Sequence, residues 1–249
     1  MTGLQANKVA IVTGGSRGIG RAICLRLAED GWSLAVGYAR EKEAAEEVVK
    51  TIGKMGRRAV SIPADIGDPS AIPLLFRYAS EALGPLGLFV ANAGMTGDAI
   101  RIDGQTVQKL RRLIDVNLLG TMLGAGEAVR RLSTRHGGAG GVIILLSSVS
   151  ARLGGLPGQV AYAATKGAIE TFTRGLANEV GPEGIRVVAI APGLTATDML
   201  PDGAEAVAQT SVPLRRVGEA SEVAEAVAWA ASSAASYLTG TTITVSGGR

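Results

Sequence analysis

Short apolar runs alternate with stretches of helical period along almost the entire chain. Seven runs rich in Val, Ile, Leu and Ala predict strands, and they cover residues 8–13, 33–38, 58–63, 87–91, 141–147, 185–191 and 242–245. Between them, apolar residues that recur every three or four positions predict helices at 17–30, 41–55, 69–83, 105–135, 158–180 and 219–234. Strands and helices that alternate in this way predict an α/β fold with one doubly wound parallel sheet.

The predicted sheet accounts for the chain as a single unit. No repeat, low-complexity tract or Pro/Ser-rich linker divides the 249 residues, and one large α/β domain of this length buries an ample core. We therefore predict a single Rossmann-type domain over 1–249, with a seven-stranded parallel sheet and helices on both of its faces. The stretch 194–217 lacks clear regularity, so we expect it to form a lid over a substrate site.

Composition narrows the range of partners. The 25 basic and 22 acidic residues are interspersed, which predicts a mixed solvated surface and no nucleic-acid partner. Ser and Thr residues interrupt the long uncharged stretch 226–248, so we expect no membrane anchor. Residues 1–8 are too short and too polar for a signal peptide. The only cysteine, Cys24, forms no intrachain disulfide and has no ligand cluster around it, which predicts no metal site and a cytoplasmic location.

A glycine-rich run follows the first predicted strand and opens the first predicted helix. Glycine permits a tight turn and lets an anion approach the backbone, where free N–H groups and the helix dipole favour a phosphate. A run at such a strand-to-helix junction therefore predicts a site for the pyrophosphate of a dinucleotide. Its residues are Thr13, Gly14, Gly15, Ser16, Arg17, Gly18, Ile19 and Gly20.

The glycine spacing, Gly-x-x-x-Gly-x-Gly, resembles that of the short-chain dehydrogenase/reductase family, and the resemblance covers essentially the whole chain. It implies further cofactor contacts where later strands end, with Asp65 meeting the adenine amino group and the sixth strand's exit holding the nicotinamide carboxamide. The matching residues are Asp65 and Ile66 after the third strand, Asn92, Ala93 and Gly94 after the fourth, and Pro192, Gly193 and Thr197 after the sixth.

The end of the second predicted strand indicates which dinucleotide binds. An acidic residue there would accept hydrogen bonds from a free ribose 2′-hydroxyl and repel a 2′-phosphate. No acidic residue precedes Glu41 at this point, whereas Arg40 lies there and Arg17 lies inside the glycine loop. Guanidinium groups are planar, bidentate donors suited to phosphate. The sequence therefore favours NADP(H) over NAD(H).

Tyr162 and Lys166 are four residues apart, so they share one face of the predicted helix 158–180. A free tyrosine has a pKa near 10, and a nearby ammonium group favours the phenolate and lowers that pKa. The pair is thus suited to acid/base catalysis at neutral pH. By resemblance to the family, Lys166 also binds the nicotinamide ribose.

Two further residues complete the expected catalytic group. Ser148 closes the fifth predicted strand, at the sheet edge where ligands bind, and its hydroxyl would stabilise a substrate carbonyl oxygen. The adjacent Ser147 is the alternative, and alignment with the family favours Ser148. Asn117 is unfavourable within a long helical pattern, which points to a functional role. In the family this Asn distorts the helix and holds a water that joins the lysine to solvent.

The resemblance implies hydride transfer between a nicotinamide and a carbonyl or secondary alcohol, with a small-molecule substrate. Several segments resemble 3-oxoacyl-thioester reductases, but sugar, polyol and small-ketone dehydrogenases share these features. Reductases that act on acyl carrier protein often have basic residues where this chain has Arg135 and Glu183, and an acidic carrier would be repelled by Glu183. A sensor or scaffold that binds NADP(H) without turnover is a further alternative, and the complete set of catalytic residue types argues against it.

Small and apolar residues occupy more than one face of the predicted helix 158–180. One face must cover the sheet, so the surplus suggests a subunit interface. By resemblance to the family we expect a homotetramer. The residues are Ala163, Ala164, Gly167, Ala168, Ile169, Phe172 and Leu176.

Overall fold

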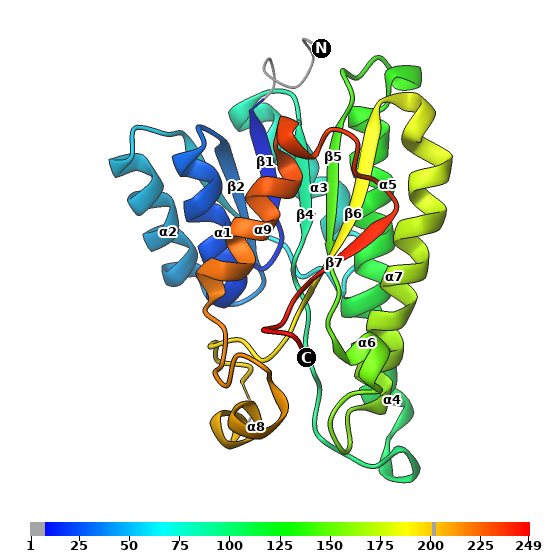
Figure 1. Cartoon of the computed structure of the whole chain (residues 1–249). Helices are drawn as coiled ribbons and strands as arrows, with labels where there is room; N and C mark the ends of the chain where they lie inside the picture. Colours follow the sequence, from blue (N-terminus) through cyan, green and yellow to red (C-terminus); the bar gives the residue numbers. More distant parts are fainter. Residues whose placement is uncertain (1–7, 201–202) are drawn as a thin grey trace.

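A seven-stranded, all-parallel β-sheet forms the centre of the molecule in a computed structural model that describes residues 8–200 and 203–249 (Figure 1). The strands are β1 (Val9–Val12), β2 (Ser33–Tyr38), β3 (Ala59–Pro63), β4 (Leu88–Ala91), β5 (Gly141–Leu146), β6 (Ile185–Pro192) and β7 (Thr241–Val245). Their order across the sheet is β3-β2-β1-β4-β5-β6-β7. The prediction of one doubly wound domain with a seven-stranded parallel sheet is confirmed.

Helices cover both faces of the sheet. The α-helices are α1 (Gly18–Glu29), α2 (Lys42–Lys54), α3 (Ala71–Leu83), α4 (Val107–Ile114), α5 (Gly120–Leu132), α6 (Ser150–Leu153), α7 (Val160–Val180), α8 (Ala204–Ser211) and α9 (Ala220–Ala231). One apolar core packs α1, α2 and α9 against the sheet, and a second packs α3, α5 and α7 against the other face. Because every central strand is covered on both sides, its residues are almost all apolar.

The strand order reverses between β1 and β4, and this reversal positions the site. The chain runs outward from β1 to β3 and then crosses back to place β4 against β1. Connections therefore leave β1 and β4 in opposite directions, which opens a crevice at their carboxyl ends where ligands bind in such sheets. The short helices α6 and α8 lie beyond these carboxyl ends, at the lower end of Figure 1.

The structure differs from the predicted elements in three places, one of which is the short helix α6 in a stretch with no predicted element. The helical pattern over 105–135 is divided into α4, a single π-helical turn at Asp115–Leu119 and α5, because one extra residue per turn leaves the apolar period almost unchanged. The predicted lid, 194–217, contains α8 and is therefore partly regular, while its residues 201 and 202 lie outside the described part. The signal-peptide prediction likewise falls on residues 1–7, outside the described part.

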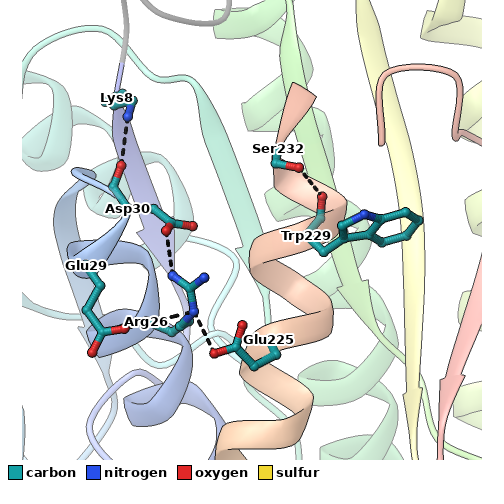
Figure 2. Close-up of polar contacts among 7 residues, drawn as sticks. All are labelled: Lys8, Arg26, Glu29, Asp30, Glu225, Trp229 and Ser232. Carbon is teal, nitrogen blue, oxygen red and sulfur yellow. Dashed lines mark hydrogen bonds and ion pairs between the residues drawn. The ribbon is translucent and has the colours of Figure 1, made fainter. Parts of the chain in front are cut away.

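Polar contacts join the two helices that pack side by side on one face, α1 and α9. Arg26 of α1 donates from Nε to Glu225 Oε1 of α9 at 2.7 Å, and its Nη1 reaches Asp30 Oδ1 at 2.6 Å (Figure 2). Lys8 donates to the Asp30 carbonyl oxygen at 2.7 Å, which ties the end of α1 to the start of β1. These contacts hold α1, whose N-terminus carries the glycine loop, in a fixed place on the sheet.

Candidate active site

A cavity of about 490 Å³ opens at the carboxyl ends of the strands, above the reversal between β1 and β4. Thr13 and Gly15 of the glycine-rich run do not line it, whereas every other residue that the sequence predicted for cofactor binding does, together with the predicted Ser148, Tyr162 and Lys166. Asn117 does not line the cavity and lies buried behind it. Segments far apart in the sequence therefore meet in one place, as the prediction required.

The glycine loop at the cavity floor has a backbone that other residues would not allow. Gly14 and Gly18 have positive φ angles of 62° and 52°, a region that disfavours residues with a Cβ. A Cβ at Gly20 would overlap the Gly14 carbonyl oxygen. Arg17 precedes α1 in an extended conformation and makes no side-chain cap, so its side chain does not occupy the N–H groups of the first turn. The loop therefore suits a phosphate group at a helix N-terminus.

Asn92 fastens this loop to β4. Its Nδ2 donates to the carbonyl oxygens of Thr13 at 2.9 Å and Gly14 at 3.1 Å. The Thr13 hydroxyl accepts in return from the backbone N–H groups of Asn92 and Ala93, each at 3.0 Å. These bonds cross the reversal in strand order and hold the two sides of the crevice together. For Asn92, the structure thus places a positioning contact within the predicted cofactor site.

Arg17 and Arg40 both stand exposed on the cavity rim, where the sequence predicted them. Arg17 Nη1 makes an ion pair with Asp198 Oδ2 at 3.2 Å, and both side chains are more than half exposed. Asp198 belongs to the segment predicted as a lid. A bridge therefore links the glycine loop to that segment across the mouth of the cavity, and sequence reasoning gave no signal for it.

Tyr162 lies near the start of α7 and faces Ser148 at the end of β5. Burial raises the pKa of Tyr162 above its ordinary value of 10, and a hydrogen bond with Ser148 partly offsets this. The direction differs from our expectation that the ammonium group of Lys166 would lower the pKa. Lys166 Nζ lies 5.9 Å from the centre of the Tyr162 ring, so burial dominates in this arrangement.

Lys166 is buried, with a side chain that donates from Nζ to the Leu146 carbonyl oxygen at 2.6 Å. Burial lowers the pKa of Lys166 to about 8, because a low-dielectric surrounding disfavours the ammonium form. The group remains mainly protonated at neutral pH. Gly94 faces it closely enough that an added Cβ would come within 3.5 Å of Nζ, so the glycine keeps the approach to this ammonium group open.

Asn117 stands in the π-helical turn, almost fully buried. Its Oδ1 accepts from the Met95 backbone N–H at 2.9 Å, and its Nδ2 donates to the Met95 carbonyl oxygen at 2.8 Å and the Thr165 hydroxyl at 3.2 Å. The side chain thus joins the segment after β4 to α7, beside the catalytic pair. The prediction that this residue distorts the helix agrees with the turn in which it lies.

The geometry distinguishes the two adjacent serines. Ser147 Oγ lies 3.1 Å from the Lys166 carbonyl oxygen and 3.2 Å from Glu170 Oε1, and its one hydroxyl hydrogen is donated to these acceptors of α7. Ser148 Oγ accepts from the Ser150 N–H at 3.1 Å and also bonds Tyr162. Ser148 is therefore the serine that lies beside the tyrosine hydroxyl.

Further residues line the cavity, some in the segment 194–217 that the sequence predicted as a lid and some, on α4, α6 and the loop after α6, that it did not predict. Apolar side chains of α6, the following loop and the segment after β6 line its outer part, and Arg112 of α4 enters from the adenine side of the expected cofactor. None belongs to a motif, and helix α6 has too few residues for a periodic signal. The apolar ones are Leu153, Leu156, Leu194, Met199 and Leu200.

Two features are absent from the described part of the chain, residues 8–200 and 203–249. No helix there is long and apolar enough to cross a membrane. No group of three or more His, Cys, Asp or Glu side chains in those ranges is placed to hold a metal ion.

The fold and the site together define an α/β oxidoreductase of the dinucleotide-binding class. The chain belongs to the short-chain dehydrogenase family, whose model matches residues 8–207. The uncharacterized oxidoreductase YgfF of Escherichia coli is 40% identical, over 97% of this chain and 99% of its own length. The 3-oxoacyl-(acyl-carrier-protein) reductase FabG of Staphylococcus aureus is 39% identical, over 98% and 99%.

A solved structure agrees with this assignment. A short chain dehydrogenase from Burkholderia cenocepacia J2315, crystallised in complex with NADP, superposes with a TM-score of 0.91 and 39% identity, covering 98% of each chain. At this similarity both the fold and the family are shared.

Proposed function

We propose that the protein is an NADP(H)-dependent reductase that converts a carbonyl group to a secondary alcohol, with Tyr162 as the proton donor. The observation that carries the proposal is the meeting of Tyr162, Ser148 and Lys166 in one cavity with the glycine loop. These groups are the ones that such a reaction needs: a proton donor, a hydrogen-bond donor for the oxygen and a cation nearby.

The residues present fit a dinucleotide. The free N–H groups of the glycine loop suit a pyrophosphate, and Gly14, Gly18 and Gly20 allow the loop's tight conformation, because Gly14 and Gly18 have positive φ angles and a Cβ at Gly20 would overlap the Gly14 carbonyl oxygen. The exits of β4 and β6 supply Gly94 and Gly193 toward the nicotinamide end of the cavity. A bound reduced nicotinamide would supply a hydride for the carbonyl carbon.

The choice of NADP(H) rests on charge at the rim. Arg40 stands at the end of β2 and Arg17 in the glycine loop, and both are exposed to a ligand in the cavity. Glu41, the next residue along the chain, is the N-cap of α2. The NADP complex of the Burkholderia cenocepacia relative supports the same choice. We infer that the two guanidinium groups share the 2′-phosphate.

The chain's own residues account for the proton chemistry. Ser148 orients the substrate oxygen and donates a hydrogen bond as negative charge develops there. Tyr162 is protonated at neutral pH, as an ordinary tyrosine is, and burial raises its pKa further; it donates that proton to the oxygen. Lys166, still mainly protonated at neutral pH, favours the phenolate that remains. Asn117 binds the backbone of Met95 and the Thr165 hydroxyl, and so fixes the position of α7 relative to the segment after β4.

A substrate panel with NADPH and NADH tests this function. Oxidation of NADPH in the presence of at least one carbonyl compound is expected, with a lower KM for NADPH than for NADH. Tyr162→Phe removes one hydroxyl group and should lower kcat about 100-fold or more while leaving NADPH binding intact. If this variant kept the wild-type turnover, the mechanism would be wrong.

Two substrate classes go into the panel. The reductase FabG, at 39% identity, supports 3-oxoacyl thioesters. Glu183 supports small ketones or sugar-derived carbonyls instead, because its carboxylate lies where carrier-dependent reductases often have a base and would repel an acidic carrier, and it pairs with Arg135 Nη1 at 3.1 Å. Turnover of 3-oxoacyl thioesters, compared with turnover of small ketones and sugar-derived carbonyls under the same conditions, separates the two.

We further propose a cytoplasmic homotetramer. Apolar side chains remain exposed on the side of the molecule formed by α4 and α5, among them Ile114, Met122 and Leu123, and a second subunit would cover them. Cys24 is buried and burial raises the pKa of its thiol, so it is inert in a reducing compartment. Light scattering after size exclusion tests the assembly, and a monomer would refute it.

A further inference from the structure

Arg112, in the last turn of α4, reaches across the cavity to Asp65 at the end of β3. Its Nη2 lies 2.9 Å from Asp65 Oδ1 and 2.8 Å from Oδ2, although the two residues are 47 positions apart. Both line the cavity, at the end where the family resemblance places the adenine. The contact therefore belongs to the site and not to the core of the fold.

The neighbouring backbone is shaped to admit this contact. A Cβ at Gly67 would overlap the Arg112 guanidinium group. The Gly67 N–H in turn donates to Asp65 Oδ1 at 3.0 Å. The missing side chain of Gly67 thus leaves space for the arginine, and the Gly67 backbone N–H fixes one oxygen of the carboxylate.

The hydrogen bonds leave one acceptor position on the carboxylate. Each carboxylate oxygen accepts about two hydrogen bonds. Oδ1 already accepts from Gly67 and from Arg112, whereas Oδ2 accepts only from Arg112. The remaining acceptor capacity lies on Oδ2, and it matches a single N–H group of a ligand.

Stability does not explain the Arg112–Asp65 pair. The two side chains are 40% and 44% exposed, and ion pairs with this much solvent contribute little to folding. Fixing the carboxylate's rotation is an effect that this pair does achieve, because Arg112 Nη2 lies within hydrogen-bond distance of both oxygens at once.

We propose that Arg112 is a positioning residue that sets Asp65 for recognition of the dinucleotide's base. With Oδ1 saturated, Oδ2 accepts from the amino group at position 6 of adenine and repels the oxygen that a 6-oxo purine carries there. Arg112 thereby gives the protein its preference for adenine over hypoxanthine in the bound dinucleotide. The inference rests on the proposed NADP(H) binding.

The test measures binding and needs no substrate. Dissociation constants of NADPH and of its hypoxanthine analogue are obtained from nicotinamide fluorescence, for the wild type, Arg112→Gln and Asp65→Asn. The wild type is expected to prefer NADPH. Arg112→Gln should weaken NADPH binding about three- to tenfold, the range of one hydrogen bond, and weaken the analogue far less, so that the preference falls.

Arg111→Gln is the matched control, since Arg111 precedes Arg112 on α4 and is exposed; its two dissociation constants should equal those of the wild type. The double variant Arg112→Gln/Asp65→Asn should lose no more preference than Asp65→Asn alone. An equal weakening of both nucleotides by Arg112→Gln, or no weakening, overturns the positioning role. A wild type that binds NADPH without preference also overturns it, whereas a wild type that binds neither nucleotide refutes the proposed function itself.

Discussion

Lys166 offers a quantitative test of the site, because the same burial that suits it to catalysis destabilises the fold. Its side chain is 5% exposed, and the only hydrogen bond that Nζ makes within the described residues is to the Leu146 carbonyl oxygen at 2.6 Å. We consider Lys166→Met, which removes the charge and keeps an unbranched apolar side chain. The variant should be inactive, and its stability should depend on pH differently from that of the wild type.

The pKa of Lys166 gives the magnitude. It falls from an ordinary value of 10.5 to about 8 in the folded protein, so between these values the unfolded chain binds more protons than the folded one. Stability therefore rises with pH across this window, and the penalty is complete below pH 8. The difference corresponds to about 3 kcal/mol at neutral pH, of which about 2 kcal/mol is regained near pH 9.5.

Urea denaturation at pH 7 and near pH 9.5 measures this effect. The wild type should gain about 2 kcal/mol relative to Lys166→Met between the two conditions. The loss of the bond to Leu146 does not obscure the gain, because a neutral amine still donates it at the higher pH. Lys54→Met, at an exposed position of α2, is the control and should follow the wild type. If Lys166→Met and the wild type changed in parallel with pH, Lys166 would not titrate near 8 and the reasoning would fail.

Three further changes test other parts of the site. Gly20→Ala places a Cβ against a backbone carbonyl oxygen and should weaken NADPH binding at least about tenfold. If fluorescence titration gave this variant the NADPH dissociation constant of the wild type, the proposed role of the glycine loop would be wrong. Asp198→Asn frees Arg17 from its exposed ion pair and should lower the KM for NADPH, but not NADH, by up to about fivefold at low salt; an equal change for both would argue against a phosphate contact. Asn117→Ala leaves the backbone groups of Met95 unpaired and should cost about 1–3 kcal/mol in urea denaturation, and an unchanged midpoint would oppose that role.

The regular part of the fold could be predicted because both apolar periods are strong. All seven strands lie within one residue of their predicted bounds, since fully buried parallel strands form short, uninterrupted apolar runs. The glycine loop was equally predictable, because its residues have a local backbone reason: Gly14 and Gly18 need positive φ angles. Features that depend on the conformation of a short segment can be predicted from the residues of that segment alone.

Contacts across the cavity could not be predicted in this way. The Arg112–Asp65 and Arg17–Asp198 pairs join residues far apart in sequence, and each member alone looks like an ordinary surface charge. Asn117 is an intermediate case. Its residue type signalled an anomaly in a helix, but the π-helical turn and its three hydrogen bonds required the placement of two other segments.

The pKa of Tyr162 shows how such placement changes a chemical conclusion. Four-residue spacing puts Lys166 near Tyr162, and this alone predicted a lowered pKa. In the fold the ammonium group bonds the end of β5, 5.9 Å from the ring centre, and burial raises the pKa instead. A phenol that keeps its proton at neutral pH is in the protonation state that carbonyl reduction requires. Alcohol oxidation would first require that proton to leave, so raising the pH should speed oxidation more than reduction.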